Sequence, residues 1–326
     1  MTVRIMLVGL GRIGATYDLN LPEREYILSY ARAIGSDSRF EFVAAIDPEI
    51  SQRKLFSSKY KAPVFSTIEK ALLSVKPEIV VVANPTELHE EVIKKLVNID
   101  SVKLIVCEKP LAQNLHVAST LVKLCSDANK RLVVNYMRRA IPKIRKYISR
   151  LNDGGEKILV GGIVRYSGGL IHNGSHFIDL MIASFGSMER FKVIRRKKIS
   201  NNDWLVDVAM FFSGASVYLL SNDFIIDNKG LIFHDIDLYS DVGRLIFRNG
   251  AREINYSEVG SDLVFDNVKT YSNNILNEEN VMNKFQTHVL NDIYDGYIEN
   301  KSFLPSGSDS LKSLEVIDKM IGNYYE

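Results

Sequence analysis

A glycine pattern that directly follows an apolar strand constrains the fold more than any other feature of this sequence. Residues 3–8 are apolar except for Arg4, and Gly9, Gly11 and Gly14 follow in a Gly-x-Gly-x-x-Gly pattern. After a strand, the first glycine permits a tight turn, the second lets the backbone approach a pyrophosphate, and the third allows close helix packing. The pattern therefore predicts a dinucleotide site at residues 9–14, which includes Arg12 and Ile13.

A second apolar run, residues 40–46, ends in Asp47. A carboxylate at that position accepts hydrogen bonds from an adenosine ribose and repels a 2′-phosphate, so NAD is favoured over NADP. Asp47 follows Gly14 at a greater distance than the roughly 20 residues usual for this fingerprint, which requires an insertion. Residues 17–26 are polar and turn-forming, so we expect a loop there, either a surface excursion or a segment that folds over the ligand cleft.

The apolar run at residues 103–107 stops abruptly at Glu108, Lys109 and Pro110. Proline cannot continue a strand ladder, so the charged pair is expected at the carboxyl edge of a parallel sheet, where ligands bind. There Lys109 could carry out proton chemistry, although an ordinary surface ion pair is the alternative. Apolar runs alternate with helical stretches as far as residue 137, and one of them ends at Asn84 and Pro85, which are expected on the same edge.

Composition narrows the class of protein. A length of 326 residues suggests two domains, and the 46% of hydrophobic residues is ample for their cores. Lys plus Arg total 41 against 39 Asp plus Glu, so no overall charge favours nucleic acid or a membrane. The cysteines, Cys107 and Cys125, lack metal-ligand spacing and are expected to be buried thiols of a cytoplasmic protein. We expect neither a signal peptide nor a membrane span.

We predict a second domain over residues 138–326, after a first domain of residues 1–137. Short apolar stretches separated by turns predict strands, and two helices follow; the strands are expected at 157–166, 204–212, 216–220, 230–238 and 244–247, and the helices at 281–298 and 308–321. No element is predicted for the polar residues 258–280. Among the basic residues of 138–150, Arg138 and Arg139 lie near a predicted strand edge, where they could bind an anionic substrate; a solvated helix face is the alternative.

A histidine-containing stretch lies between the first two of these strands. His172 and His176 are four residues apart and Asp179 follows, so a helix would place all three on one face. Zinc could bind such a histidine pair, but no further ligand has a recognisable spacing, and we predict no metal. Two other roles are open for these residues. They could cap a helix or pack in the core, or they could form the polar wall of a substrate pocket in which one histidine is a general acid or base.

Together these motifs resemble the glucose-fructose oxidoreductase, inositol dehydrogenase and MocA family, across nearly the whole chain. The similarity rests on the glycine pattern, Asp47, the Asn84-Pro85 loop with His89, Glu108-Lys109-Pro110, and Gly169 to Asp179. It implies a Rossmann domain, a second α+β domain with an open, largely antiparallel sheet, and hydride transfer at a carbohydrate carbon. It also implies that Lys109 exchanges the proton, with His176 beside it. The further cofactor-binding residues that it implies are Asn84, Pro85, His89 and Glu108.

One position departs from the family pattern, since many sugar dehydrogenases have Asp where this sequence has His172. The exchange replaces a permanent anion with a titratable ring, which affects the proton relay and the choice of substrate. The insertion after Gly14 is similar to that of members in surface-polysaccharide and amino-sugar biosynthesis. Sugar phosphates or nucleotide sugars would suit the arginines, and Arg138, Asn173 and Asp179 are the candidate substrate-binding residues.

Two functions from different classes follow. The first is an NAD-dependent sugar dehydrogenase, and the second is a catalytically idle sugar or NAD sensor of the same fold. Retention of Lys109 together with His176 favours the enzyme, since a sensor needs no acid–base group. Residues 205–212 are apolar on both predicted faces, so a homodimer or homotetramer is expected, unless residues 258–280 fold back as the cover.

Overall fold

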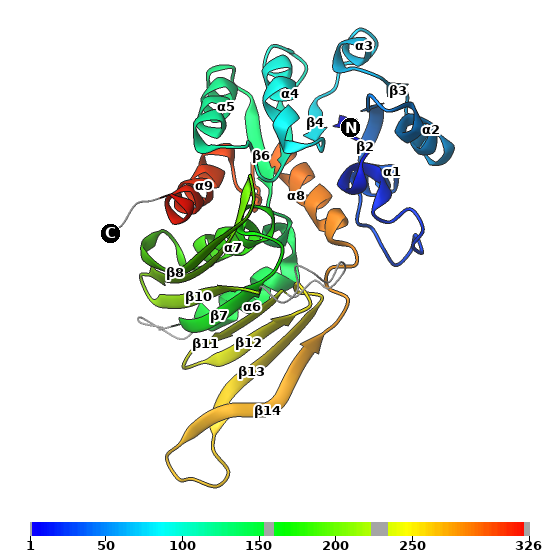
Figure 1. The fold of residues 1–326 in the computed structure, drawn as a ribbon. Coiled ribbons are helices and arrows are strands. Elements are labelled where there is room, and N and C mark those ends of the chain that lie inside the picture. The colour runs from blue at the N-terminus through cyan, green and yellow to red at the C-terminus, as the bar shows by residue number, and fades with distance from the viewer. Residues whose placement is uncertain (1, 153–159, 223–233, 323–326) are drawn as a thin grey trace. The chain divides into compact units, whose positions relative to one another are not determined.

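The computed structural model describes residues 2–152, 160–222 and 234–322. They form two compact units, one of Met1–Ala140 and Asn283–Leu314, the other of Ile141–Met282 and Glu315–Glu326 (Figure 1). The predicted strands at 157–166 and 230–238 fall partly outside the described residues.

The first unit is built on a six-stranded parallel sheet with the order β3-β2-β1-β4-β5-β6. Its strands are β1 (Val3–Val8), β2 (Phe40–Ile46), β3 (Val64–Phe65), β4 (Ile79–Val82), β5 (Leu104–Glu108) and β6 (Arg131–Asn135). The central strand β4 is Ile-Val-Val-Val and fully buried. Such continuous apolar runs form central strands because helices cover both faces, and the predicted doubly wound sheet is confirmed.

Helices cover this sheet from both sides (Figure 1). They are α1 (Tyr30–Gly35), α2 (Ile50–Lys59), α3 (Ile68–Leu72), α4 (His89–Leu96), α5 (Leu115–Asp127) and α8 (Phe285–Glu299). One core cluster joins α1 and α8 to Leu7 and Val81, and another joins α4 and α5 to Met6 and Val80. Successive residues of one strand thus enter opposite cores, as the two-residue period of a strand requires.

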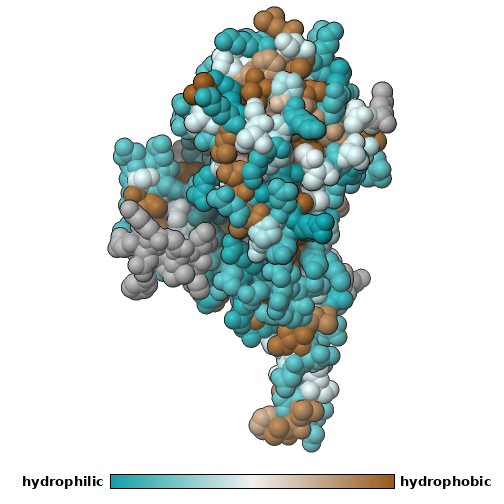
Figure 2. Space-filling model, turned by 90° about the vertical axis from the view of Figure 1, so that its right-hand side faces the viewer, coloured by the Kyte–Doolittle hydropathy of each residue, from teal (hydrophilic) through white to brown (hydrophobic). Residues whose placement is uncertain are grey.

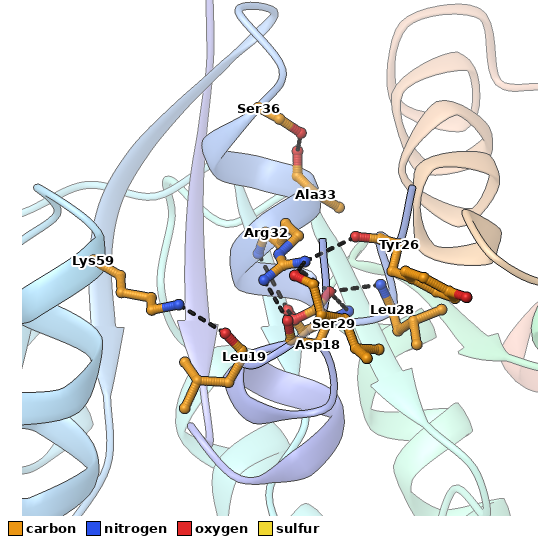
Figure 3. A network of polar contacts seen from close by, with 10 residues as sticks. Asp18, Leu19, Tyr26, Leu28, Ser29, Arg32, Ala33, Ser36 and Lys59 are labelled. Carbon is orange, nitrogen blue, oxygen red and sulfur yellow. Dashed lines mark hydrogen bonds and ion pairs between the residues drawn. The ribbon is translucent and has the colours of Figure 1, made fainter. Parts of the chain in front are cut away.

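The insertion after the glycine pattern is a loop, as predicted, and it has its own buried anchor (Figure 3). Asp18 is fully buried and accepts hydrogen bonds from the backbone N–H groups of Leu28 (2.7 Å) and Ser29 (2.9 Å). The Arg32 guanidinium lies 3.6 Å from the same carboxylate and donates to the carbonyls of Leu21 and Tyr26. Helix α1 begins only after this loop, at Tyr30, so the turn at Arg12–Thr16 is a separate short π-helical turn.

The second unit holds an eight-stranded sheet with the order β14-β13-β12-β11-β7-β10-β9-β8. All its neighbours are antiparallel except β7 and β10. Its strands are β7 (Val160–Tyr166), β8 (Met188–Ser200), β9 (Asp203–Phe212), β10 (Ala215–Ser221), β11 (Asp235–Tyr239), β12 (Gly243–Arg248), β13 (Glu253–Ser261) and β14 (Lys269–Glu278). The predicted open, largely antiparallel sheet is confirmed.

One face of this sheet is covered by α6 (Pro142–Asn152) and α7 (Ser175–Phe185). Tyr147 of α6 contacts Tyr256 of β13, and Phe185 of α7 contacts Phe212 of β9, each pair with ring centroids 5.8 Å apart. The buried residues of β7 alternate with half-buried ones, which is typical of a sheet covered on one side. The last helix, α9 (Gly307–Ile321), follows α8 close to the predicted positions.

Residues 258–280 do not fold back over the sheet, so that alternative is wrong for the described residues. They form the end of β13 and all of β14, and they extend the sheet at its edge. On β9 the outward-facing Leu205 and Ala209 are buried within the chain, and the guanidinium of Arg190 lies 4.0 Å above the ring of Phe211. The long cationic side chains of β8 therefore cover part of the second apolar face of β9, for which the sequence had predicted a cover from another subunit.

A search of the described helices finds none that is both long and apolar enough to cross a membrane.

We predict that Asp18→Asn lowers the free energy of unfolding by about 3 kcal/mol, because it leaves the buried Arg32 guanidinium without its counter-charge. Urea unfolding measures the change. The control is Lys59→Met, which removes an exposed amine that donates to the Leu19 carbonyl and should change stability by no more than about 0.5 kcal/mol. Equal effects of the two substitutions would show that the ion pair does not anchor the loop.

Candidate functional site

The polar residues singled out in the first domain lie along one edge of its sheet. Val8 is in register with Ile46 on one side and Val82 on the other, and Val82 with Cys107. The segments that follow these strands therefore leave the sheet together at its carboxyl edge. The strand order reverses between β1 and β4, and such a switch point is where doubly wound sheets bind ligands.

The glycine turn is tightly built against this edge. Gly9 has a φ of +95°, and a side chain there would collide with the backbone of Ala83. A side chain on Gly14 would collide with the Gly9 carbonyl, whereas one on Gly11 would meet nothing within 4 Å. The turn thus packs closely at its first and last glycines and leaves space at the middle one, as a cradle for a phosphate requires. Arg12 is exposed next to that space, and Ile13 is half-buried.

Asp47 ties the end of β2 to the glycine turn. Its side chain is 8% exposed, and its Oδ2 accepts a hydrogen bond from the backbone N–H of Leu10 (2.9 Å). Its Oδ1 accepts one from Glu49 (2.8 Å). Each carboxylate oxygen has a second lone pair, so the same group can also accept hydrogen bonds from ribose hydroxyls. Sequence reasoning had considered only the ribose role.

The loop after β4 is fixed by His89. This ring is 1% exposed; its Nε2 lies 3.0 Å from the carbonyl oxygen of Asn84, and its Nδ1 lies 3.1 Å from that of Pro110. Burial lowers the pKa of His89, so the ring stays neutral at physiological pH. His89 therefore links the loops after β4 and β5, including Asn84 and Pro85, and holds them in position.

Glu108 lies in a polar cluster at the end of β5. Its Oε1 accepts hydrogen bonds from the hydroxyl of Tyr30 (3.0 Å) and from the side-chain amide of Asn135 (2.6 Å). Burial raises the pKa of Glu108, against the opposing effects of the Asn135 hydrogen bond and the Lys109 charge. Burial and the Glu108 charge raise the pKa of Tyr30 well above its ordinary value, so Tyr30 remains a hydrogen-bond donor. The carboxylate beside Lys109 is thus held in a fixed position.

Two features of this edge fit a bound dinucleotide. The side-chain Oδ1 atoms of Asn84 and Asn135 are buried, and neither has a hydrogen-bond partner among the described residues. Buried acceptors of this kind are costly unless a ligand or water satisfies them. With the space at Gly11, they give the edge both a phosphate cradle and unsatisfied acceptors further along the sheet.

The histidine-containing stretch of the second domain forms a π-helical turn, Leu170–Gly174, that runs directly into α7. His172 in the turn is exposed, whereas His176 and Asp179 in α7 are buried. The side-chain amide of Asn173 donates to the Ser167 carbonyl (2.6 Å). The three residues predicted to share a helical face therefore differ in their exposure, and the amide of Asn173 stabilises its own loop.

Asp203, the first residue of β9, fixes the start of that turn. Its carboxylate accepts hydrogen bonds from the backbone N–H groups of Ile171 (2.8 Å) and His172 (3.1 Å). Sequence reasoning missed Asp203, as it missed Tyr30 and Asn135. All three act on residues far away in the chain, so no local spacing could have identified them.

Arg138 is 6% exposed in the short helical turn Met137–Ala140 and belongs to the first unit. Burial lowers its pKa to about 10, so the guanidinium still carries its charge at neutral pH. Both thiols are buried, unoxidised and have raised pKa values because of that burial. Across the described residues, no cluster of three or more His, Cys, Asp or Glu could hold a metal ion.

Comparison with known proteins identifies the first domain. Residues 3–136 match the family described as "Oxidoreductase family, NAD-binding Rossmann fold". A curated relative, inositol 2-dehydrogenase of Rhizobium meliloti (strain 1021), is 27% identical over 154 residues, or 47% of this chain. The match spans only 42% of that relative. For residues 3–136, this match confirms the family recognised from the sequence motifs.

The similarity to solved structures covers both domains of this chain. One is the WlbA dehydrogenase from Bordetella pertussis in complex with NADH and UDP-GlcNAcA, with a TM-score of 0.74, 16% identity, and coverage of 98% of this chain and 94% of that one. Another is a putative NADPH-dependent oxidoreductase from Desulfitobacterium hafniense, with a TM-score of 0.75, 18% identity and 99% coverage of both chains. At these identities the likeness shows the fold alone.

We predict that the stabilising effect of Glu108 depends on pH. A carboxyl group whose pKa is higher in the folded chain than in the unfolded chain favours folding while it is protonated, and this contribution is lost as the pH rises from about 4 through the folded pKa. The free energy of unfolding of the wild type minus that of Glu108→Gln should therefore fall between pH 4 and pH 8. Urea unfolding across that range tests it, with the exposed Glu41→Gln as control; a rising difference would contradict the raised pKa.

Proposed function

We propose that this protein, whose first domain belongs to the NAD-binding oxidoreductase family, is an NAD-dependent dehydrogenase that acts on a carbohydrate CH–OH group. The observation that carries the proposal is the meeting of a glycine turn, a carboxylate at the end of β2 and the Glu108–Lys109 pair on one sheet edge. This edge combines the requirements for cofactor binding with a titratable amine.

In this proposal the backbone at Gly9 to Gly14 holds the pyrophosphate, with Arg12 and Ile13 at its side, and Asp47 accepts the ribose hydroxyls. Asn84, Pro85 and Glu108 border the nicotinamide end. The cofactor, when bound, supplies the hydride acceptor or donor. The chain itself orients the cofactor with acceptors that are already fixed by hydrogen bonds. Few side chains therefore have to become ordered when the cofactor binds.

Lys109 is the proposed proton-transfer residue. As the hydroxyl-bearing carbon loses its hydride, its hydroxyl proton passes to the Lys109 amine, and the reverse step returns it. Glu108, held by Tyr30 and Asn135, provides a fixed negative charge next to that amine when ionised. This charge stabilises the ammonium form produced by proton transfer.

The residues on the substrate side are proposed from the family resemblance. His176 would orient or share the proton, with His172 as a titratable neighbour, and Arg138, Asn173 and Asp179 would contact the sugar. WlbA is bound to UDP-GlcNAcA and another relative is an inositol dehydrogenase, which supports a sugar, sugar phosphate or nucleotide sugar as substrate. A cytoplasmic location is proposed from the two buried thiols.

We further propose a homodimer or homotetramer that assembles through the second unit. The sheet face opposite α6 and α7 carries large side chains that the chain leaves open. Tyr218 of β10 is 45% exposed and Tyr239 of β11 is 48% exposed. Exposed aromatic side chains on an uncovered sheet are typical of an interface with another subunit.

We predict that NAD(H) binds at least tenfold more tightly than NADP(H), since Asp47 would repel a 2′-phosphate. Titration of the protein with both cofactors measures the ratio. Asp47→Asn keeps an acceptor for the Leu10 N–H but removes the charge, so it should reduce the preference for NAD(H) over NADP(H). Equal affinities in the wild type would show that Asp47 does not face the ribose.

We predict that Lys109→Met lowers turnover by a factor of about 100 or more and leaves NAD binding nearly unchanged, because only the proton-transfer group is lost. The control is Lys103→Met, an exposed lysine immediately before the same strand, which should retain full activity. Near-native turnover of Lys109→Met would contradict the assigned role. Absence of dehydrogenase activity from the wild type with every sugar class tested would favour the sensor.

A further inference from the structure

The insertion after the glycine turn, residues 17–29, is a fixed part of the first unit. Its core is the buried pair of Asp18 and Arg32, which Figure 3 shows in contact. Arg32 also donates to the carbonyls of Leu21 and Tyr26, so the loop closes around one guanidinium. Opening the loop as a lid would break this buried ion pair, which is strongly destabilising.

The end of the insertion is also joined to helix α8. The backbone N–H of Ile27 donates to the Asn283 carbonyl (2.8 Å), and the N–H of Gln286 donates to the Ile27 carbonyl (3.2 Å). The N–H groups of the next two residues are bound by the Asp18 carboxylate. Three successive residues before α1 are therefore fixed through their backbone, and so is the start of that helix.

The outer side of the insertion has the composition of ordinary protein surface. Tyr17 is 43% exposed and Leu21 37%, and the Arg12 guanidinium lies 4.7 Å from the Tyr17 ring. In Figure 2, which views the right-hand side of Figure 1, hydrophilic and hydrophobic residues are interspersed over the upper part of the molecule. Scattered apolar residues are common on protein surfaces, so the outer side does not explain why the insertion is there.

The inner side of the insertion leads directly to the proposed active site. Tyr30 is the first residue of α1, and its side chain is completely buried. Its hydroxyl donates to Glu108 Oε1 at 3.0 Å, although the two residues are 78 positions apart. In a Rossmann unit the first helix usually follows the glycine turn directly. Because α1 begins only after the insertion here, the insertion determines which side chain reaches the end of β5.

We propose that the insertion is a support for the acid–base pair: it fixes Tyr30, and Tyr30 orients Glu108 beside Lys109. This inference rests on the proposed function, in which Lys109 exchanges the proton of the substrate hydroxyl. Tyr30 is then a positioning residue, because it acts on the reaction only through Glu108. The insertion thus serves the chemistry through a hydrogen bond, not as a cover over the ligand cleft.

The balance of effects on Glu108 makes this hydrogen bond important. The groups that face its carboxyl are Lys109 next to it, the Cys107 thiol on β5, Tyr30 on α1 and the neutral amide of Asn135 on β6. Burial raises the pKa of Glu108, whereas the Asn135 hydrogen bond, the Lys109 charge and the Tyr30 hydrogen bond lower it. Loss of the Tyr30 hydroxyl therefore raises the pKa further, so less of the carboxylate stays ionised at neutral pH.

A second tyrosine–glutamate pair in the first unit provides a contrast. The Tyr297 hydroxyl donates to Glu78 Oε1 (2.8 Å), and the Arg4 guanidinium lies 3.4 Å from Glu78 Oε2. Burial raises the pKa of Glu78, but the hydrogen bonds from Arg4 and Tyr297 outweigh it, and the pKa is lowered. Glu78 immediately precedes β4, so this pair lies at the amino edge of the sheet, opposite the proposed active site.

The first experiment follows the ionisation of Glu108 in the full chain by carbon-13 NMR of the glutamate carboxyls, with its signal identified by its absence from Glu108→Gln. Tyr30→Phe should raise the pKa of Glu108 by about one unit, the size expected for losing a hydrogen bond to a charged group. Asp18→Asn and the milder Ser29→Ala, which removes a hydroxyl bound to Asp18 (2.7 Å), loosen the insertion and should each raise it less. Tyr297→Phe, the matched control, should leave it unchanged.

The second experiment measures turnover in the oxidation direction as a function of pH. An ionised Glu108 stabilises the ammonium form of Lys109, so the ratio of wild-type to Tyr30→Phe turnover should fall as the pH rises from about 6 to about 9, by up to about tenfold for one unit of pKa shift. A purely structural loss would lower turnover equally at every pH. In the Glu108→Gln background, Tyr30→Phe should have no pH-dependent effect.

The outcomes separate this inference from the proposed function. An unchanged Glu108 titration in Tyr30→Phe, or a turnover ratio that does not vary with pH, overturns the inference and leaves an active dehydrogenase standing. An unshifted titration in both Asp18→Asn and Ser29→Ala overturns the role of the insertion. A wild type that turns over no sugar tested overturns the proposed function, and with it the role of Tyr30 in catalysis, even if the NMR titration shifts.

Discussion

The common direction of the strands in the first sheet is the constraint on which the proposed active site depends. Because β1, β2, β4, β5 and β6 are parallel and in register, every loop that follows them leaves from the same edge. Both faces of the sheet are buried under helices, where a polar group without a hydrogen-bond partner would be costly. Polar groups therefore gather at this edge. The glycine turn, Asp47 and Lys109 meet there although long stretches of sequence separate them.

Hydrogen bonds between the loops keep that edge rigid. Asp47 holds the glycine turn through Leu10, and His89 holds the loop after β4 to the loop after β5. Tyr30 and Asn135 hold Glu108. Each link joins groups from different strands, so the loops support one another and a ligand meets prearranged donors and acceptors. The buried pair of Asp18 and Arg32 gives the inserted loop the same kind of anchor.

The first domain was predictable because its strands and glycine turn have strong local patterns. The Asp–Arg anchor and the Tyr30–Glu108 bond were not, since they join residues whose contact depends on tertiary packing. Strands β13 and β14 were missed for another reason. The end of β13 and most of β14 are exposed or half-buried on both faces, so they show no alternation of apolar and polar residues, and residues 258–280 looked irregular in the sequence. His172 and His176 matched a helical spacing, but a π-helical turn starts their segment and leaves only His176 buried.

The two sheets distribute their exposed surface in opposite ways. In the first, helices bury both faces and only the carboxyl edge remains for chemistry. In the second, α6 and α7 cover one face, and among the described residues no helix covers the other face, where Tyr218 and Tyr239 are exposed. An open sheet edge invites pairing with other chains unless charge or twist prevents it. The cations of β8 oppose indiscriminate pairing at one edge of this sheet, because a second strand with the same charge would be repelled there.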